Sequence, residues 1–167
     1  DVDVYFLANA GLFVTRFWNW FYTHMYCIPI KRISDQKTET RKPVSNRASF
    51  ERVIEFLVGG GCIWIAPEGG SYWGRHWLSL KTGAARMALL SEAEKDFELG
   101  LQVLPIGLNY AAPDLFRTRL VINVGEPIDV SEYKAAYEAE YYGAVKELTK
   151  ELENRLQGLE IAPSDEE

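Results

Sequence analysis

The chain of 167 residues has the length of one domain, and its 47% hydrophobic content suffices for a single substantial core. A formal net charge of −6 argues against a general nucleic-acid binder, because such proteins carry clustered Lys and Arg. Cys27 and Cys62 lie in apolar stretches without Cys-x-x-Cys spacing. This pattern predicts buried free thiols on the cytosolic side of a membrane rather than a disulfide framework. We expect one domain at residues 1–158 and an acidic tail at 159–167.

The first predicted element is a strand from Val4 to Leu7, and no initiator methionine or signal peptide precedes it. We therefore expect a fragment, with missing chemistry encoded upstream. An aromatic-rich helix is predicted from Gly11 to about Met25, and a strand from Tyr26 to Ile30. That helix is too short and too polar to span a bilayer, which takes about 20 apolar residues. Its Trp and Phe side chains suit either a membrane surface or the protein core, and the sequence leaves both open.

After a polar loop at 34–46, the predicted elements alternate between helix and strand. They are a helix capped by Ser45 or Asn46 and ended by Gly59-Gly60-Gly61, a strand at 62–66, a helix capped by Thr82 from Gly83 to about Glu94, strands at 101–108 and 120–124, and a helix from about Ser131 to Gly158. The unbroken apolar run at 62–66 predicts a strand covered on both faces. The alternating helices and strands together predict an α/β fold with a layered, mostly parallel or mixed central sheet flanked by helices.

The strand at 62–66 leads directly into the turn Pro67-Glu68-Gly69-Gly70. Ligands of open α/β sheets bind beyond the carboxyl ends of strands, and paired glycines let backbone N–H groups approach a phosphate closely. Glu68 could accept a hydrogen bond from a substrate hydroxyl or hold an Arg in place. An ordinary strand-to-loop turn is an equally good interpretation of these residues alone.

A phosphate site also needs cations near that turn. The candidates are Lys31, Arg32, Arg75 and Lys81. Arg75 is as well suited to a surface ion pair as to an anion contact. We therefore predict an acceptor or phosphate site formed by Arg32, Pro67, Glu68, Gly69, Gly70, Arg75 and Lys81.

Four short blocks occur in the order seen in the lysophosphatidate and glycerol-phosphate acyltransferases, which the chain resembles over nearly its whole length. They are Ala66-Pro67-Glu68-Gly69, Lys81-Thr82-Gly83-Ala84-Ala85-Arg86, Val103-Leu104-Pro105-Ile106-Gly107 and Gly125-Glu126-Pro127-Ile128. The resemblance implies a glycerol-3-phosphate acyltransferase-like fold and assigns the acceptor to Pro67, Glu68 and Gly69, and its phosphate to Arg32. Gly70-Ser71 replace the family's Thr-Arg, so Arg75 is the expected substitute for the missing charge.

The family's general base, the His of a His-x-x-x-x-Asp motif, is absent. Pro29 follows His24 and Lys81 follows His76 at the position where the motif has Asp. The resemblance places the motif before the strand at Val4–Leu7, so we expect it upstream, no catalytic residue in this chain, and an inactive fragment. His76 is interpreted as structural.

The expected function is that of a bacterial-type, membrane-associated O-acyltransferase of phospholipid biosynthesis. The resemblance implies transfer of a fatty acyl group from acyl-CoA or acyl carrier protein to a lysophosphatidate-like acceptor, without a metal or redox cofactor. Its expected place is the cytoplasmic face of a membrane, peripheral or anchored through segments outside this chain. The alternative is a non-catalytic lipid- or anion-binding module of the same fold.

Overall fold

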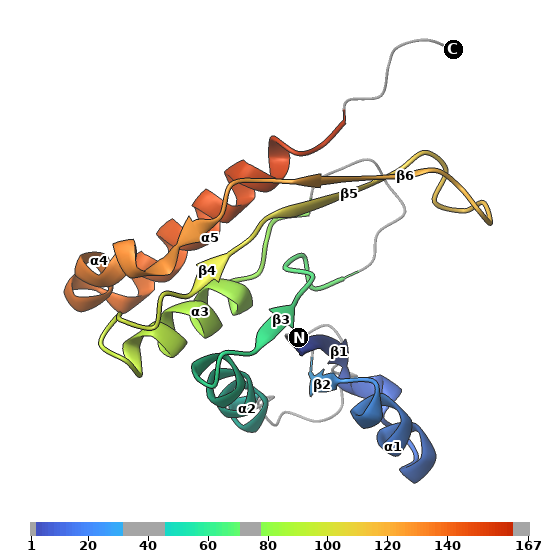
Figure 1. Cartoon of the computed structure of the whole chain (residues 1–167), viewed down its shortest axis with the longest axis horizontal. Coiled ribbons are helices and arrows are strands. Elements are labelled where there is room, and N and C mark those ends of the chain that lie inside the picture. The colour runs from blue at the N-terminus through green and yellow to red at the C-terminus, as the bar shows by residue number, and fades with distance from the viewer. Residues whose placement is uncertain (1–2, 32–45, 71–77, 162–167) are drawn as a thin grey trace, which may run out of the picture.

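The computed structural model describes residues 3–31, 46–70 and 78–161. In chain order its elements are β1 (Val4–Asn9), the 3-10 helix η1 (Ala10–Leu12), α1 (Arg16–His24), β2 (Cys27–Ile30), α2 (Arg47–Val58), β3 (Cys62–Trp64), α3 (Gly83–Ala93), β4 (Gln102–Val103), β5 (Ile106–Tyr110), β6 (Leu120–Val124), β7 (Ile128–Asp129), the 3-10 helix η3 (Val130–Tyr133), α4 (Lys134–Ala139) and α5 (Tyr141–Gln157) (Figure 1). Among the described helices, none is long and apolar enough to cross a bilayer.

The first half of the chain forms a parallel three-stranded sheet in the order β2-β1-β3. The register pairs Phe6 of β1 with Cys27 of β2 and with Trp64 of β3. One face of this sheet packs on α2 through a core that includes Ile28, Val53 and Leu57. The α/β prediction, with a parallel sheet flanked by helices, is therefore confirmed.

On the second face of the parallel sheet, α1 contacts β2, whereas the residues of β3 that turn to this face are exposed. Side chains alternate along a strand, so Ile63 turns toward α2 while Cys62 and Trp64 turn to the opposite face, where both are exposed. The prediction that residues 62–66 form a strand covered on both faces is therefore wrong for the described protein, and the strand ends at Trp64. Both cysteines are free, as expected. Their predicted burial is wrong, because Cys62 is exposed and Cys27 is half-buried.

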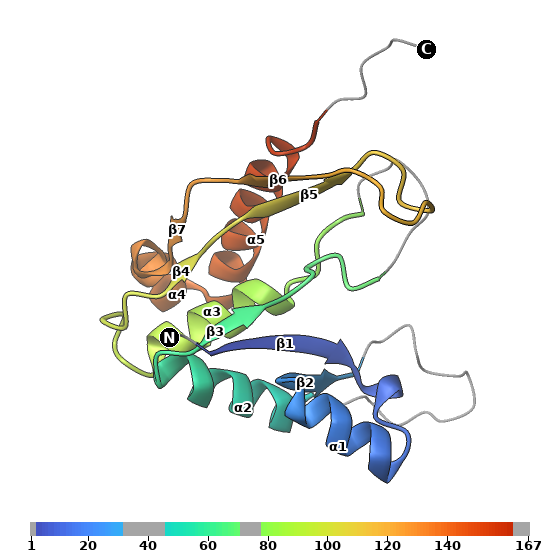
Figure 2. The same ribbon diagram turned by 45° about the vertical axis from the view of Figure 1, so that its right-hand side comes forward.

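The segment at 101–108, predicted as one strand, forms two strands in two different sheets. β4 pairs antiparallel with β7, and β5 pairs antiparallel with β6 (Figure 2). The break falls at Leu104-Pro105, because proline has no N–H to donate to a ladder. The Pro105 carbonyl instead accepts from the N–H of Gly125, 2.9 Å away.

The C-terminal half has its own core, in which α3 and α5 pack together. Tyr141, Val145, Leu148, Leu152 and Leu156 are spaced at steps of three and four, which predicts one apolar stripe on α5. The stripe is confirmed, because Val145, Leu148, Leu152 and Leu156 of α5 are buried. The single helix predicted from Ser131 is wrong, because Glu140 has extended backbone angles (φ −158°, ψ 107°) and separates α4 from α5.

The end of the described chain is held against the β5–β6 hairpin. The carbonyl of Leu159 accepts from the side-chain amides of Asn109 and Asn123, at 3.1 and 2.9 Å. The N–H of Ile161 donates to Asn109 Oδ1 at 3.0 Å. These bonds place residues 159–161, the start of the predicted acidic tail, on the domain.

The predicted N-terminal helix is shorter than expected and lies outside both cores. Thr15 caps α1, its Oγ1 accepting from the N–H of Trp18 at 3.3 Å, so the helix begins at Arg16 rather than Gly11. No α1 residue is buried. The interpretation that its aromatic side chains belong to the protein core is therefore wrong.

Candidate active site

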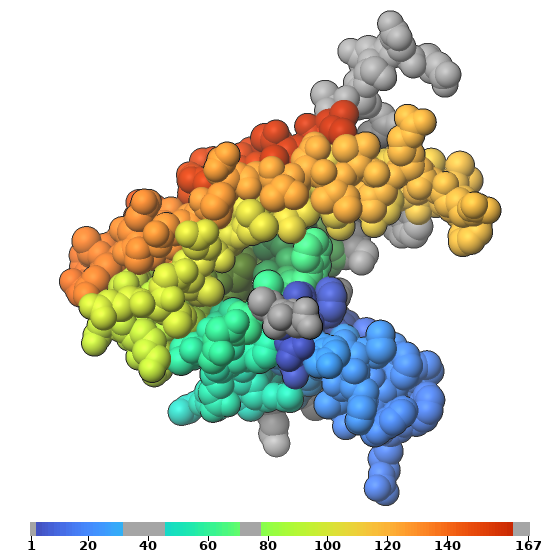
Figure 3. All heavy atoms as spheres, viewed as in Figure 1, coloured from blue at the N-terminus to red at the C-terminus, as the bar shows by residue number. Residues whose placement is uncertain are grey.

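The candidate site lies at the carboxyl edge of the parallel sheet. Since β1, β2 and β3 run in the same direction, their carboxyl ends meet at this edge. Asn9 ends β1, Lys31 follows β2, and the turn Pro67–Gly70 follows β3. Figure 3 shows a hollow there, between the β5–β6 hairpin above and the β1 and α1 region below.

The turn is closed by backbone bonds that bring Lys81 beside it. The N–H of Lys81 donates to the Pro67 carbonyl at 2.8 Å, and the N–H of Gly69 donates to the Ala66 carbonyl at 3.3 Å. Gly69 has φ +66°, and a Cβ atom added there would lie 3.1 Å from Lys81 Cγ. Five members of the predicted site, Pro67, Glu68, Gly69, Gly70 and Lys81, are therefore brought together. The two arginines predicted to join them, Arg32 and Arg75, lie outside the described residues.

Asn46 links α2 to the end of β2. Its Oδ1 accepts from the N–H of Lys31 at 3.0 Å, and its Nδ2 donates to the Lys31 carbonyl at 2.8 Å. Asn46 occupies the N-cap position of α2, but its side chain makes no cap bond, because it is used in this double contact. The contact holds the backbone immediately before Arg32. Sequence reasoning proposed Ser45 or Asn46 as the cap of this helix and missed the contact of Asn46 with Lys31.

The described histidine does not reach the turn. A helix joining two parallel strands must return to the amino edge of the sheet, and His24 ends α1 shortly before β2 begins at Cys27. Its Nδ1 lies 2.7 Å from the Trp20 carbonyl. His24 is thus bound within its own helix at the edge opposite the turn, while His76 lies outside the described residues. The described ranges also contain no group of three or more His, Cys, Asp or Glu that could hold a metal ion.

An apolar cavity of about 280 Å³ extends from the turn into the protein. Pro67 lines it, together with side chains from β3, α3, α5 and residues 101–106. The wall contributed by α3 consists of Ala84, Met87 and Ala88, whose spacing of three and four places them on one side of the helix. The small residues of α3 are also what close packing on a sheet predicts, and sequence reasoning therefore missed the cavity. Their spacing was the signal that could have indicated it.

Comparison with known proteins identifies the family. The family model described as Acyltransferase matches residues 1–109. The chain belongs to this acyltransferase family. Glycerol-3-phosphate O-acyltransferases 1 and 2 of Saccharomyces cerevisiae are both 37% identical to it, over 127 and 114 residues. An uncharacterised acyltransferase of Schizosaccharomyces pombe is 42% identical over 91 residues.

Coverage limits how far these likenesses extend. The matched part of this acyltransferase-family chain is 74% of its own length but 17% of the length of glycerol-3-phosphate O-acyltransferase 1. For the Schizosaccharomyces pombe protein the two shares are 54% and 13%, and for glycerol-3-phosphate O-acyltransferase 2 they are 68% and 15%.

A solved structure shares the fold. The crystal structure of the 1-acyl-sn-glycerophosphate acyltransferase PlsC from Thermotoga maritima aligns with a TM-score of 0.55 and 20% identity, covering 93% of this chain and 55% of that one. This likeness confirms the expected acyltransferase-like fold.

Proposed function

We propose that this chain forms the acceptor- and acyl-binding part of an O-acyltransferase of phospholipid biosynthesis. The observation that carries the proposal is the junction at Pro67, where a glycine turn with a neighbouring cation opens onto an apolar cavity. A phosphate-bearing glycerol acceptor needs the first feature, and a fatty acyl chain needs the second. The acceptor hydroxyl attacks the thioester carbonyl, the new ester bond forms as the C–S bond breaks, and the thiol leaves.

Each residue of the turn has a distinct role in this proposal. The Lys81 ammonium makes no hydrogen bond or ion pair with the described residues, so it is available to the acceptor phosphate. Gly69, with its φ of +66°, lets the phosphate approach the backbone of the turn closely. Glu68 is half-buried and has no hydrogen-bond partner among the described residues. Its carboxylate can therefore accept a hydrogen bond from a hydroxyl group of the substrate. We assign Arg32 and Arg75 to further contacts with the phosphate.

We propose that the catalytic base lies in a part of the protein outside these 167 residues. A His-x-x-x-x-Asp motif in the parent chain would supply the base that takes the hydroxyl proton, with Asp orienting the His. Acyl-CoA or acyl carrier protein would be the donor, with no metal or redox cofactor. The enzyme would work at the cytoplasmic face of a membrane, peripherally or through anchors elsewhere in its chain. The curated relatives are yeast proteins, and the bacterial type expected from the resemblance stays a prediction.

The test is acyl transfer by the full-length protein, with labelled acyl-CoA and either glycerol 3-phosphate or lysophosphatidate. Lys81→Ala should raise the acceptor KM roughly tenfold or more, because a charge-assisted hydrogen bond contributes about 1.5–3 kcal/mol. Lys81→Arg should recover part of the loss, and Lys146→Ala on the exposed face of α5 should leave KM unchanged.

Two results would count against the proposal in different ways. Unchanged acceptor KM in both Lys81→Ala and Glu68→Ala would overturn the site assignment. Acceptor binding that depends on Lys81, without acyl transfer by the full-length protein, would favour the non-catalytic lipid- or anion-binding module. The non-catalytic alternative is tested because the described histidine, His24, is bound at the opposite edge of the sheet and cannot act as the base at this turn.

A further inference from the structure

Helix α1 carries large apolar side chains that the described protein leaves in solvent. Phe17 and Trp20 are 62% and 56% exposed, and Met25, which directly follows the helix, is 55% exposed. With Trp18 and Phe21, which are also exposed, they form what we call the aromatic surface. A surface helix normally turns its apolar stripe toward the core, whereas this one has no buried residue.

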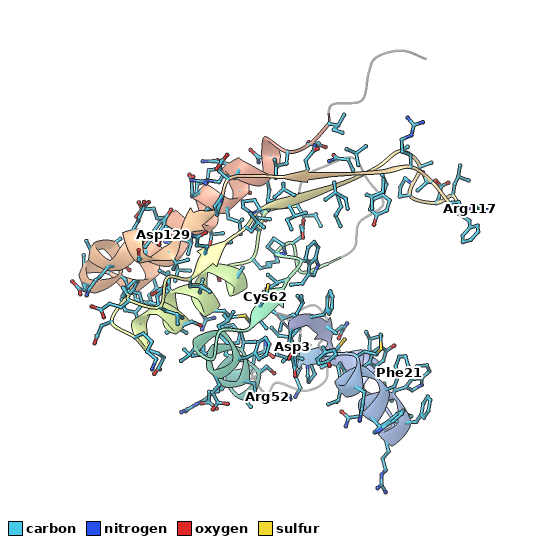
Figure 4. The ribbon with its side chains drawn as sticks, in the orientation of Figure 1. Asp3, Phe21, Arg52, Cys62, Arg117 and Asp129 are labelled. Carbon is cyan, nitrogen blue, oxygen red and sulfur yellow. The ribbon has the colours of Figure 1, made fainter. Side chains whose placement is uncertain are left out.

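The aromatic surface is continuous. Phe17 and Phe21 lie one turn apart with ring centroids 6.4 Å from each other, and Trp18 contacts Phe21 at 5.8 Å. The rings thus pack on one another and not on either core. Figure 4 shows Phe21 directed away from the sheet and from the body of the protein. A contiguous apolar patch of this kind marks a contact with a membrane or another protein.

The charges around the aromatic surface favour an anionic partner. The whole chain has 24 acidic and 18 basic residues, yet the stretch from Val4 to Lys31 contains no Asp or Glu. Its charged side chains are Arg16, at the start of α1, and Lys31. Trp and Phe beside an Arg suit the headgroup region of an anionic bilayer, where rings enter the boundary and the guanidinium meets phosphate.

The tip of the β5–β6 hairpin is also apolar and, on balance, basic. Leu115 is 63% and Phe116 is 94% exposed, and Arg117 and Arg119 outnumber the one acidic residue of the tip, Asp114. In Figures 1 and 2 this tip and α1 project at the same end of the molecule, toward which β1 points. The hollow that contains the candidate site lies between them (Figure 3).

We infer that the aromatic surface of α1, together with the hairpin tip, is where this protein rests on an anionic lipid bilayer. α1 has nine residues and lies in the headgroup region without crossing it. In this position the turn at Pro67–Gly70 faces the lipid surface from which a lipid acceptor would enter. The inference deepens the proposed place at a membrane, and its test needs no catalysis.

The test is the partitioning of this 167-residue chain onto vesicles of phosphatidylcholine with or without phosphatidylserine, measured by flotation. Wild type should bind the vesicles that contain phosphatidylserine, and less so at high salt. The double variant Trp20→Ser/Phe21→Ser should bind at least about tenfold more weakly, because each ring loses its apolar contact with lipid. Phe116→Ser should weaken binding less, as one ring is removed.

The control is Tyr142→Ser, an exposed aromatic on α5 that should leave binding unchanged. Circular dichroism should show that all variants keep the wild-type fold. Equal vesicle binding by wild type and the double variant would overturn the inference. So would a dimer in solution that the double variant converts to monomer while vesicle binding stays the same, since a second copy would then cover α1. Acyl transfer to glycerol 3-phosphate from a soluble donor tests the proposed function separately.

Discussion

At the scale of single residues, the acceptor turn depends on the backbone of Gly69. Its φ of +66° lies in the left-handed region, which side chains with a Cβ rarely adopt, and Lys81 Cγ occupies the nearby space. Gly70, next along the chain, has neither constraint, because a Cβ atom there would meet nothing within 4 Å. The two glycines therefore form a matched pair for testing whether backbone shape matters to the acceptor.

We predict that Gly69→Ala raises the acceptor KM of the full-length enzyme several-fold and that Gly70→Ala changes it little. The added methyl group at Gly69 costs about 1 kcal/mol of backbone strain and displaces Lys81. The measurement is steady-state kinetics with the acceptor varied at saturating acyl donor. If both variants show the same KM as wild type, the turn does not bind the acceptor.

The nearness of Lys81 to the turn could be predicted from residue types and order, but the contact of Asn46 with Lys31 could not. Asn at the start of a helix normally caps it, so local propensity indicated the wrong partner. The observed partner lies 15 positions earlier, across a loop, and bonds of that range depend on how the elements pack.

At the scale of elements, apolar periodicity located most helices and strands but not where they break. The stripe of α5 is confirmed because steps of three and four describe one helix face. The break at Glu140 was missed because the residues before it are good helix formers. The open face beside β3 was missed because an apolar run does not show what covers it.

Glu92 of α3 holds the loop that leads into β4. Its side chain is completely buried, and its carboxylate accepts the backbone N–H groups of Leu99, at 3.1 Å, and Leu101. Leu101 and the strand after it line the cavity. The buried carboxylate of Glu92 thus holds in place the backbone that forms one wall of the candidate acyl site.

We predict that Glu92→Leu lowers the free energy of unfolding by about 3 kcal/mol, because two N–H groups lose their acceptor inside the protein. Glu92→Gln should cost less, since one amide oxygen remains to accept. Glu94→Gln, an exposed neighbour, should stay within about 0.5 kcal/mol of wild type. Urea unfolding followed by circular dichroism measures all three. Equal stability of Glu92→Leu and wild type would show that these bonds do not hold the loop.

At the scale of the whole molecule, the cavity depends on contacts between the two halves of the chain. Val53 and Ile63 belong to the N-terminal half, Leu101 and Leu152 to the C-terminal half, and all four line the same space. Periodicity describes one element at a time, so it could not show that these faces meet around an empty volume. The α/β class could be predicted, because the class depends on the order of elements alone.

The final prediction concerns the length of the acyl chain. Ala84 lines the cavity from the first turn of α3, and Ala84→Leu would fill space that the proposed acyl chain occupies. Each buried methylene contributes about 0.8 kcal/mol, so displacing two of them should lower kcat/KM for a palmitoyl donor roughly tenfold. An octanoyl donor, too short to reach the filled part, should be affected much less.

Ala135→Leu, at an exposed position of α4, is the control for adding the same side chain outside the cavity. It should leave the ratio of palmitoyl to octanoyl transfer at its wild-type value. An equal loss with both donors in Ala84→Leu would mean that the substitution disturbs the turn and not the acyl site. A lowered ratio confined to Ala84→Leu would instead link the cavity to the acyl group, because the two donors differ only in the length of the acyl chain.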